Sequence, residues 1–548
     1  MSSDWQIVAE SFQNRRAERL PTRWTIPEPI PENISASNSQ VADLLPQWLS
    51  VEEIKLTSLG ASALASKILA REYTSVQVTE AFCHRASLAQ QLTNCLSEVF
   101  FDEALERAQQ LDNILQSTGN PVGPLHGVPI SVKDHFNIKG QFTTAGYISY
   151  GQDPPKDEDA HVVDILRNAG AVLYTKTANP QCMMVLETVS NIHGRTLNPW
   201  NTHLGPGGSS GGEGALLALQ GSPLGLGSDI GGSIRVPAAF NGVYGFKPSA
   251  KRIPISGVEC TMAGSESIMP SVGPLGRNVE DLELFFRVVL GTEPWTREPL
   301  LKLPWKSIPF DPDKKLSVGV MSNDGVVTPH PYMTHAIKGI AQKLISAGHE
   351  VINFTPYKHK ESWDDILLPL YFPDGGLDIK NTLEAGKEPM LPSAKRLIDD
   401  PIIKNLSHHE LWKLQIARDE YRKKYLQKWA ETGSQTQNRE PIDVLICPVA
   451  PAAGTPHDVK PWWGYCSQWN LLDYPAGVIP VGKVLPGDAY PANYQAANDL
   501  DQENMDLYDR CDYGGMPIAI QVVGPTHEDE NVMNAMKILD QLINHQNI

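Results

Sequence analysis

The chain has 548 residues, 41% of them hydrophobic and 20% charged, a composition typical of a globular protein with a large buried core. Its formal net charge of −17 disfavours nonspecific binding to nucleic acid or to an anionic membrane surface. No apolar run reaches the ~18 residues of a transmembrane helix, and the first residues lack the apolar segment of a secretory signal. We therefore expect neither nucleic acid nor a membrane as a partner.

The seven cysteines are widely spaced, odd in number and form no CxxC pair. This pattern is typical of free thiols in a reducing compartment. Because the sequence also shows no secretory signal, we expect a cytoplasmic protein.

The first 58 residues are predicted to form an N-terminal arm that is helical and then rich in proline. Trp5, Val8 and Phe12 recur at the spacing of one helical face, and a proline-rich stretch at residues 21–31 follows. Segments of this kind usually pack on the surface of a domain or of a partner subunit.

Residues 59–548 are predicted to form the main domain. Up to about residue 115 the apolar spacing indicates helices, with Asp102 as a candidate N-cap. Short apolar strands then alternate with helices. Strands are predicted at residues 128–132, 171–174, 223–227, 316–321, 350–354, 443–447 and 518–523, and helices at 161–168, 211–219, 331–347 and 528–543. This alternation predicts an α/β fold with one large sheet covered by helices on both faces. A polar, helical insertion is predicted at about residues 355–440, placed to roof a cleft.

A glycine-rich stretch at residues 205–214 contains six glycines and opens a predicted helix. It matches neither GxxxxGK[ST] nor GxGxxG, which argues against a phosphate-binding loop and a nucleotide-binding protein. Residues 207–211 fit GxSxG, but a nucleophile elbow needs a strand leading directly into it and a later acid and histidine. A plain tight turn with helix-capping serines is the remaining structural interpretation.

Two further segments give this stretch a chemical interpretation. Residues 229–235 (DIGGSIR) can turn so that consecutive backbone N–H groups point at one place, as a developing oxyanion requires, although alone they would usually be only a turn. Lys133 ends a predicted strand, where a lysine is usually solvated. A buried lysine would instead have a lowered pKa and act as a base. Lys133 can then serve as base, one serine of the clusters as relay and another as nucleophile, without a histidine.

The three segments at residues 127–134 (GVPISVKD), 207–212 (GGSSGG) and 229–235 together resemble the amidase signature family. Ser209 and Ser233 lie 24 residues apart and Lys133 precedes Ser209 by 76, spacings similar to those of the family. The resemblance spans roughly residues 60–540 and includes residues 242–249 (GVYGFKPS) and 271–274 (SVGP). Segments that resemble the fungal acetamidase branch lie at residues 90–95, 122–127 and 470–475.

The resemblance implies a role for each matching residue. Ser233 would be the nucleophile that forms an acyl-enzyme, Ser209 the bridging serine after a cis Gly208–Ser209 peptide bond, and Lys133 the terminal base. The backbone N–H groups of an oxyanion hole would come from Ile230, Gly231, Gly232 and Ser233. Ser209 and Met183 would border the substrate, with Ser210, Asp229 and Arg235 as supports. Ser228 stands where many members have threonine.

The resemblance also implies a single domain with a mixed central sheet, no metal or cofactor, and a homodimer. The expected reaction is hydrolysis of a small-molecule amide by water, with small aliphatic amides such as acetamide as first candidates. Hydrolysis of carbamates or esters, of aryl-acetamides or of fatty amides by the same three residues remains an alternative. A glutaminase-like subunit of a tRNA-linked amidotransferase is less favoured, and the intact Lys133, Ser209 and Ser233 argue against an inactive scaffold.

Overall fold

An eleven-stranded mixed sheet runs through the centre of the molecule in the computed structural model, which describes residues 4–27 and 41–545. From edge to edge its strands are β1 (Leu96–Val99), β3 (Val172–Thr177), β2 (Pro129–Lys133), β7 (Leu224–Asp229), β9 (Ser271–Gly276), β8 (Tyr244–Lys247), β14 (Ala476–Lys483), β15 (Pro517–Val523), β12 (Val444–Pro448), β10 (Ser317–Val320) and β11 (Glu350–Asn353). β2 is parallel to β3 and β7, and β10 is parallel to β11 and β12. The other neighbours in this sheet are antiparallel. The mixed α/β sheet in a single large domain is therefore confirmed.

Both faces of this sheet are buried. Successive side chains of a strand point to opposite faces, so alternate residues of one strand show what covers each face. In β12, Val444 and Ile446 join one hydrophobic cluster, whereas Leu445 and Cys447 join a second cluster on the other face. The predicted coverage on both faces is thus confirmed at the level of single residues.

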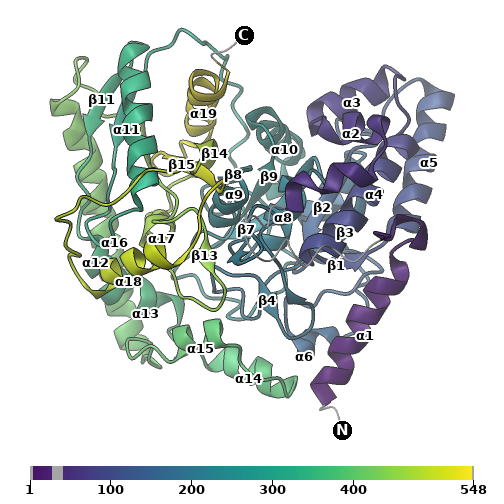
Figure 1. Ribbon diagram of the computed structural model, residues 1–548, viewed down its shortest axis with the longest axis horizontal. Coiled ribbons are helices and arrows are strands. Elements are labelled where there is room, and N and C mark those ends of the chain that lie inside the picture. Colours follow the sequence, from purple (N-terminus) through teal and green to yellow (C-terminus); the bar gives the residue numbers. More distant parts are fainter. Residues whose placement is uncertain (1–3, 28–40, 546–548) are drawn as a thin grey trace.

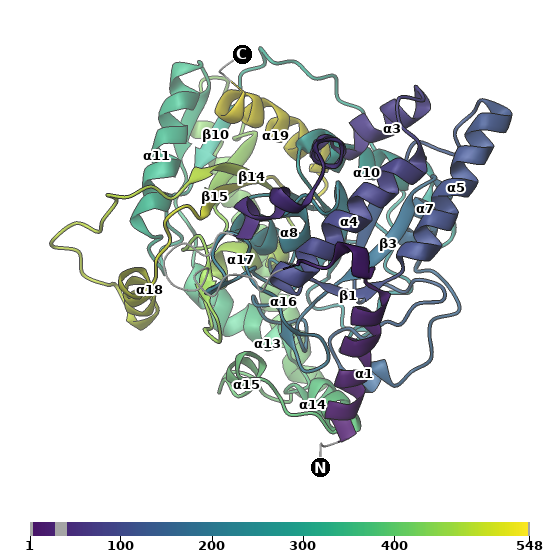
Figure 2. The same cartoon turned by 45° about the vertical axis from the view of Figure 1, so that its right-hand side comes forward.

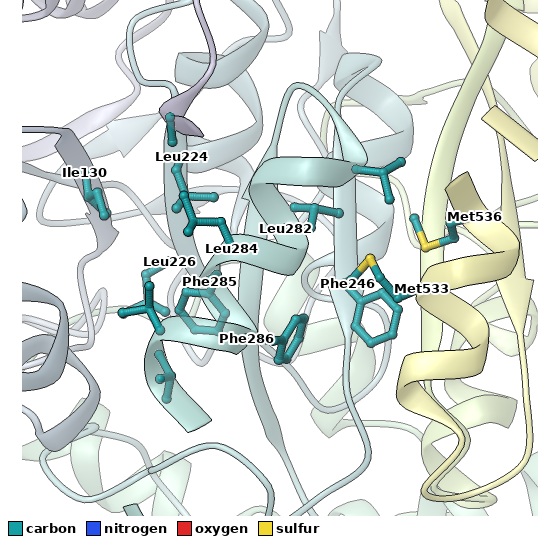
Figure 3. Packing of buried hydrophobic residues seen from close by; sticks show 14 of the residues in the cluster. Ile130, Leu224, Leu226, Phe246, Leu282, Leu284, Phe285, Phe286, Met533 and Met536 are labelled. Carbon is teal, nitrogen blue, oxygen red and sulfur yellow. The ribbon is translucent and has the colours of Figure 1, made fainter. Parts of the chain in front are cut away.

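Different helices supply the two clusters. The first contains residues of α3 (Ala61–Leu69), α7 (His161–Asn168), α10 (Val279–Gly291), α11 (Pro331–Ser346) and α19 (Asp529–Asn544). Figure 3 shows Phe286 of α10 and Met533 of α19 on either side of Phe246 in β8. The second contains residues of α9 (Arg235–Asn241), α16 (His408–Glu431) and α17 (Gly464–Leu471). At the β1 edge, α4 (Ser75–Thr93), α5 (Phe101–Thr118) and α8 (Gly211–Ala218) contribute to a third cluster; Figure 1 shows α4 and α5 on the right and α8 nearer the middle.

The N-terminal helix α1 (Asp4–Arg19) packs against the main body. Phe12 contacts the cluster that contains Ile148 and Ile192, and Arg16 donates a hydrogen bond to the carbonyl of Leu96 at 2.7 Å. α6 (Ile148–Gly151) contacts both α1 and α14 (Leu377–Ala385), and Figure 2 shows α1 and α14 at the lower end of the molecule. Further along, α2 (Val51–Ser58) packs on α4. Residues 28–31 of the predicted proline-rich stretch lie outside the described residues.

The region predicted as an insertion is helical. It contains α12 (His359–Ser362), α13 (Leu368–Tyr371), α14, α15 (Pro392–Ile398) and α16, and α18 (Asp499–Arg510) follows later in the chain. Residues of α13, α14, α15 and α16 belong to the second hydrophobic cluster, so this region is packed onto the sheet layer rather than standing apart from it.

Several predicted elements are confirmed and others are corrected. The helix predicted at residues 161–168 has those bounds, and α11 and β15 lie within one residue of their predicted ranges. Asp102 is not the N-cap of α5: Phe100 holds that position, and Asp102 lies in the first turn, where a carboxylate favours the positive end of the helix dipole. β1 was predicted as helix, and β8, β9 and β14 were not predicted.

Two global expectations concern membranes and thiols. Across the described part of the chain, no helix combines the length and apolarity needed to cross a bilayer. All seven cysteines are free thiols, as predicted.

Two glycines within helices allow the effect of tight packing on stability to be compared with the effect of intrinsic helix propensity. A Cβ on Gly212 in α8 would lie 2.5 Å from the backbone atoms Ala178 N and Cys95 O, whereas a Cβ on Gly339 in α11 would meet nothing within 4 Å. We expect Gly212→Ala to lower the free energy of unfolding by about 1–3 kcal/mol, because these neighbouring backbone atoms cannot move aside easily. Gly339→Ala should raise it by about 0.5–1 kcal/mol. Urea denaturation of both variants checks this, and equal shifts would contradict it.

Candidate active site

Lys133 ends β2, and its side chain is completely buried. Its Nζ lies 2.7 Å from Oγ of Ser209 and 3.0 Å from Oγ of Ser228, to both of which it can donate a hydrogen bond. Ser228 belongs to β7, which runs parallel to β2. Since the carboxyl ends of parallel strands meet at one edge of a sheet, Lys133 and Ser228 come together there.

Ser209 lies on the glycine-rich segment that leads into α8. The Gly208–Ser209 peptide bond is cis, as the resemblance implied. A Cβ on Gly208 would lie 2.4 Å from the carbonyl oxygen of Glu187, so the close approach of two backbones requires a glycine here. The backbone N–H of Ser210 donates to the carbonyl of Ser233 at 3.1 Å, which ties this segment directly to the turn at residues 229–235.

That turn is built around a fully buried ion pair between Asp229 and Arg235. Arg235 donates from Nη2 to Asp229 Oδ1 at 3.0 Å and from Nε to Oδ2 at 3.1 Å. The backbone N–H groups of Gly232 and Ile234 also donate to this carboxylate, at 2.8 and 3.1 Å. Burial alone would raise the pKa of Asp229, but the charge of Arg235 and the hydrogen bonds outweigh it and lower the pKa. Asp229 is therefore a stable carboxylate that organises the turn.

The same contacts narrow the set of candidate oxyanion donors. The N–H of Gly232 already donates to Asp229. Since a buried carboxylate needs its hydrogen-bond donors, this N–H is not available to an oxyanion. The N–H groups of Ile230, Gly231 and Ser233 remain as candidates. The carbonyl of Ile230 accepts a hydrogen bond from the hydroxyl of Tyr371 at 2.6 Å, which helps to fix the orientation of this turn.

Ser209, Ser228 and Ser233 border one cavity of about 350 Å³. Lys133 lies behind Ser209 and is not part of its wall. The wall is mostly apolar and includes Met183, Met184, Ile230, Ile255, Val258, Ile268, Met269 and Leu370. Met183, predicted to border the substrate, lines this cavity, which joins hydroxyl groups at one end to an apolar volume.

Burial lowers the pKa of Lys133 to about 7, although the charges of Asp229 and Glu213 act in the opposite direction. Glu213 of α8 accepts hydrogen bonds from Ser131 Oγ at 2.6 Å and Thr177 Oγ1 at 2.9 Å. Burial raises the pKa of Glu213 to about 8, so its opposing charge is small at neutral pH. A substantial share of Lys133 is then a neutral amine next to a hydroxyl, an arrangement that permits proton transfer.

The structure thus brings the sequence-predicted site residues into one region, where they form three groups. Lys133 and Ser209 are in hydrogen-bond contact, Ser209 and Ser233 border the same cavity with Met183, and Ser210, Asp229 and Arg235 lie buried behind the turn.

Three residues near the site were not predicted from the sequence. His135 Nε2 lies 3.0 Å from Ser228 Oγ, Tyr371 contacts the turn, and Asn470 donates to Asp229 and accepts from Arg235. His135 follows Lys133 by two residues, a spacing that could have indicated it. Tyr371 and Asn470 are distant in sequence. Asn470 begins the segment 470–475 that resembles the fungal acetamidase branch, but that resemblance gave it no role at the turn, and no local pattern points to Tyr371.

Within residues 4–27 and 41–545, no group of three or more His, Cys, Asp or Glu side chains is arranged to hold a metal ion.

Comparison with known proteins gives consistent results over nearly the whole chain. A family model described as Amidase matches residues 77–533. An acetamidase of Emericella nidulans is 39% identical over 551 residues, covering 99% of each chain. An acetamidase of Aspergillus oryzae is 37% identical over 554 residues, covering 99% of this chain and 100% of its own. A solved structure of a fatty acid amide hydrolase matches with a TM-score of 0.93 and 33% identity, covering 98% of this chain and 95% of its own.

The buried ion pair predicts a large loss of stability when one partner is neutralised. Asp229→Asn leaves the Arg235 charge buried without compensation, and we expect the free energy of unfolding to fall by about 3–5 kcal/mol. Asp399→Asn is the matched control, because Asp399 pairs with Lys395 on an exposed helix surface, where a pair contributes less than about 1 kcal/mol. Urea denaturation followed by tryptophan fluorescence compares them, and shifts of similar size would refute a dominant role for the buried pair.

Proposed function

The chain belongs to the amidase signature family, and on that premise we propose that it is a serine amidohydrolase that converts carboxylic acid amides to acid and ammonia through an acyl-enzyme on Ser233. The observation that carries the proposal is the contact between a buried Lys133 and Ser209, which shares a cavity with Ser233. This arrangement supplies a base, a relay and a nucleophile without a histidine.

Acylation begins with neutral Lys133 accepting the proton of Ser209, while Ser209 accepts the proton of Ser233. The Oγ of Ser233 forms a bond to the amide carbonyl carbon, and the carbonyl oxygen becomes an oxyanion. Backbone N–H groups of Ile230, Gly231 and Ser233 are the proposed donors to that oxygen. Such donors each lower the barrier by a few kcal/mol, because they are fixed before the charge develops.

The leaving nitrogen needs a proton before the C–N bond breaks. In the proposed mechanism Lys133 returns its proton through Ser209 to that nitrogen, and ammonia departs from the Ser233 acyl-enzyme. A water molecule then attacks the ester carbon, with Ser209 and Lys133 again taking the proton. As the ester C–O bond breaks, Lys133 returns that proton through Ser209 to Oγ of Ser233, which restores the serine hydroxyl and the neutral amine and releases the carboxylic acid.

Small amides are the first proposed substrates. Two relatives that match nearly the whole chain are named acetamidases, which supports acetamide and its short homologues as substrates. Ethyl carbamate and simple esters would use the same three residues, and release of alcohol rather than ammonia alone would identify them.

A second candidate is the hydrolysis of amides with larger apolar acyl groups, including aryl-acetamides and fatty amides. A mostly apolar cavity of about 350 Å³ favours it, because sites for ligands far larger than acetamide start at roughly 300 Å³. The solved structure named fatty acid amide hydrolase is compatible with this candidate.

A lysine base predicts an acid limb in the pH profile. Below pH about 7 Lys133 is protonated and cannot accept a proton, so kcat/KM should fall about tenfold for each further pH unit and level off above pH about 7. The measurement is ammonia release from a neutral amide between pH 5 and 9, with Ser233→Ala as the background. A flat profile down to about pH 5 would contradict a neutral-lysine base.

Acyl length distinguishes the two substrate candidates. Ammonia release should be measured for primary amides of increasing acyl length, up to aryl and long aliphatic groups. Highest kcat/KM for the shortest acyl groups supports small amides, and highest kcat/KM for bulky apolar groups supports the second candidate. In either case Ser233→Ala should lower kcat by more than about 10³-fold, because no nucleophile remains.

The nucleophile assignment has its own control. A serine-directed phosphonate should label Ser233 in the unaltered protein and leave the Ser233→Ala variant unlabelled. Labelling of that folded variant at Ser209 or Ser210 would overturn the assignment.

A further inference from the structure

His135 is a buried histidine that the mechanism above does not use. It lies two residues beyond Lys133, only 4% exposed, in a segment that pairs with residues 257–259. The backbone N–H of Glu259 donates to the carbonyl of His135 at 2.8 Å, and Phe136 forms an antiparallel bridge with Val258. These contacts hold the imidazole in one place.

The two ring nitrogens of His135 face different partners. Nδ1 lies 3.2 Å from the carbonyl oxygen of Glu259, and Nε2 lies 3.0 Å from the hydroxyl of Ser228. A carbonyl oxygen can only accept a hydrogen bond, so Nδ1 carries the proton. Burial, helped by the nearby charge of Lys133, lowers the pKa of His135 well below its usual range, so the ring is neutral. Nε2 is then an acceptor, and the Ser228 hydroxyl donates to it.

This orientation determines what Ser228 offers to Lys133. With its hydrogen directed at His135, the Ser228 oxygen presents a lone pair to Lys133 Nζ at 3.0 Å and accepts an N–H from it. A neutral amine has two hydrogens and one lone pair. When one hydrogen is held by Ser228, the lone pair can point at the Ser209 hydroxyl, 2.7 Å away.

We propose that His135, acting through Ser228, is a positioning residue that aims the lone pair of neutral Lys133 at Ser209. The proposal rests on the proposed role of Lys133 as base. The other ionisable groups that influence His135 and Lys133 are Asp134, Lys176, Glu213 and Asp229. Asp134 and Asp229 have buried cationic neighbours, and Glu213 is held by two hydroxyl groups. Ser228, by contrast, contacts both His135 and Lys133, so it is the contact through which His135 acts on the lysine.

Loss of the acceptor at His135 would free the Ser228 hydroxyl to rotate. Its hydrogen could then be donated to the Lys133 lone pair, in competition with Ser209. That state stabilises neutral Lys133 but aims its lone pair away from the relay. The expected consequence is a lower kcat together with a lower pKa of Lys133, a combination that a loss of packing alone does not produce.

The test compares His135→Leu, which removes the acceptor, with His135→Gln, which keeps an oxygen acceptor near the position of Nε2. We expect His135→Leu to lower kcat about tenfold, as for the loss of one oriented hydrogen bond, and to shift the acid limb to lower pH. His135→Gln should retain most of the activity and the original midpoint.

His330→Leu is the matched structural control. His330 is also buried with lowered pKa, and its ring contacts the Tyr332 hydroxyl and the Asn504 carbonyl, away from the cavity. It should lower stability and leave the midpoint of the pH profile unchanged.

Ser228→Ala tests the same chain of contacts with a smaller change, and it serves if His135→Leu does not fold. We expect it to lower kcat and to shift the midpoint of the pH profile to lower pH. Adding His135→Gln to the Ser228→Ala variant should cause no further change. A midpoint that stays or moves to higher pH in His135→Leu or Ser228→Ala would overturn the proposal. So would a His135→Gln variant as impaired as His135→Leu, since the imidazole itself would then be required. Ammonia release that survives Ser233→Ala would instead refute the proposed function.

Discussion

The chemistry of this site depends on the burial of one lysine amine without a carboxylate beside it. Lys133 and Lys176 are both completely buried, at the ends of the neighbouring parallel strands β2 and β3. Lys176 Nζ lies 3.7 Å from Asp134 Oδ1 and donates to the carbonyl of Phe142, so opposite charge and a backbone acceptor compensate its burial. Lys133 meets only hydroxyl groups at hydrogen-bond distance in the described structure. Desolvation is therefore less compensated at Lys133, which is what a base requires and a structural cation does not.

A site that depends on hydroxyl contacts of this kind needs a rigid support, and the second half of the chain supplies much of it. Arg235 donates to the carbonyl of Cys466 at 3.0 Å, to Gln521 at 3.1 Å and to Asn470 at 2.6 Å, besides Asp229. Lys133 and Ser209 come from the first half. Arg235 thus links the turn that carries Ser233 to the second half of the chain. In the ion pair between Asp229 and Arg235, each carboxylate oxygen accepts hydrogen bonds from several donors. This is the condition under which a buried ion pair can be tolerated.

Local patterns in the sequence predicted much of this arrangement, and long-range contacts explain what they missed. Lys133 at the end of a strand, the helix after residues 207–212 and the turn at 229–235 follow from short apolar runs and glycines. β8, β9 and β14 were missed because glycine and proline interrupt their apolar character, although they are central in the sheet. Asn470 and Tyr371 reach the site only through tertiary packing. The role of His135 does not follow from the sequence, because its hydrogen bonds depend on Glu259 and Ser228, which only the fold places around the ring.

The reacting groups and the cavity wall come from different kinds of structure, and this difference bears on how substrate range can vary. Ser209, Ser233 and their supports are held by buried hydrogen bonds, where loss of one partner leaves another unsatisfied. The wall is formed largely by apolar side chains of residues 255–272 and of α13, such as Met269 and Leu370, which interact mainly through packing. Packing tolerates a change of size better than a buried polar network tolerates a lost partner. Changes in the wall can therefore alter the acyl group that fits while the amine of Lys133 keeps the same surroundings.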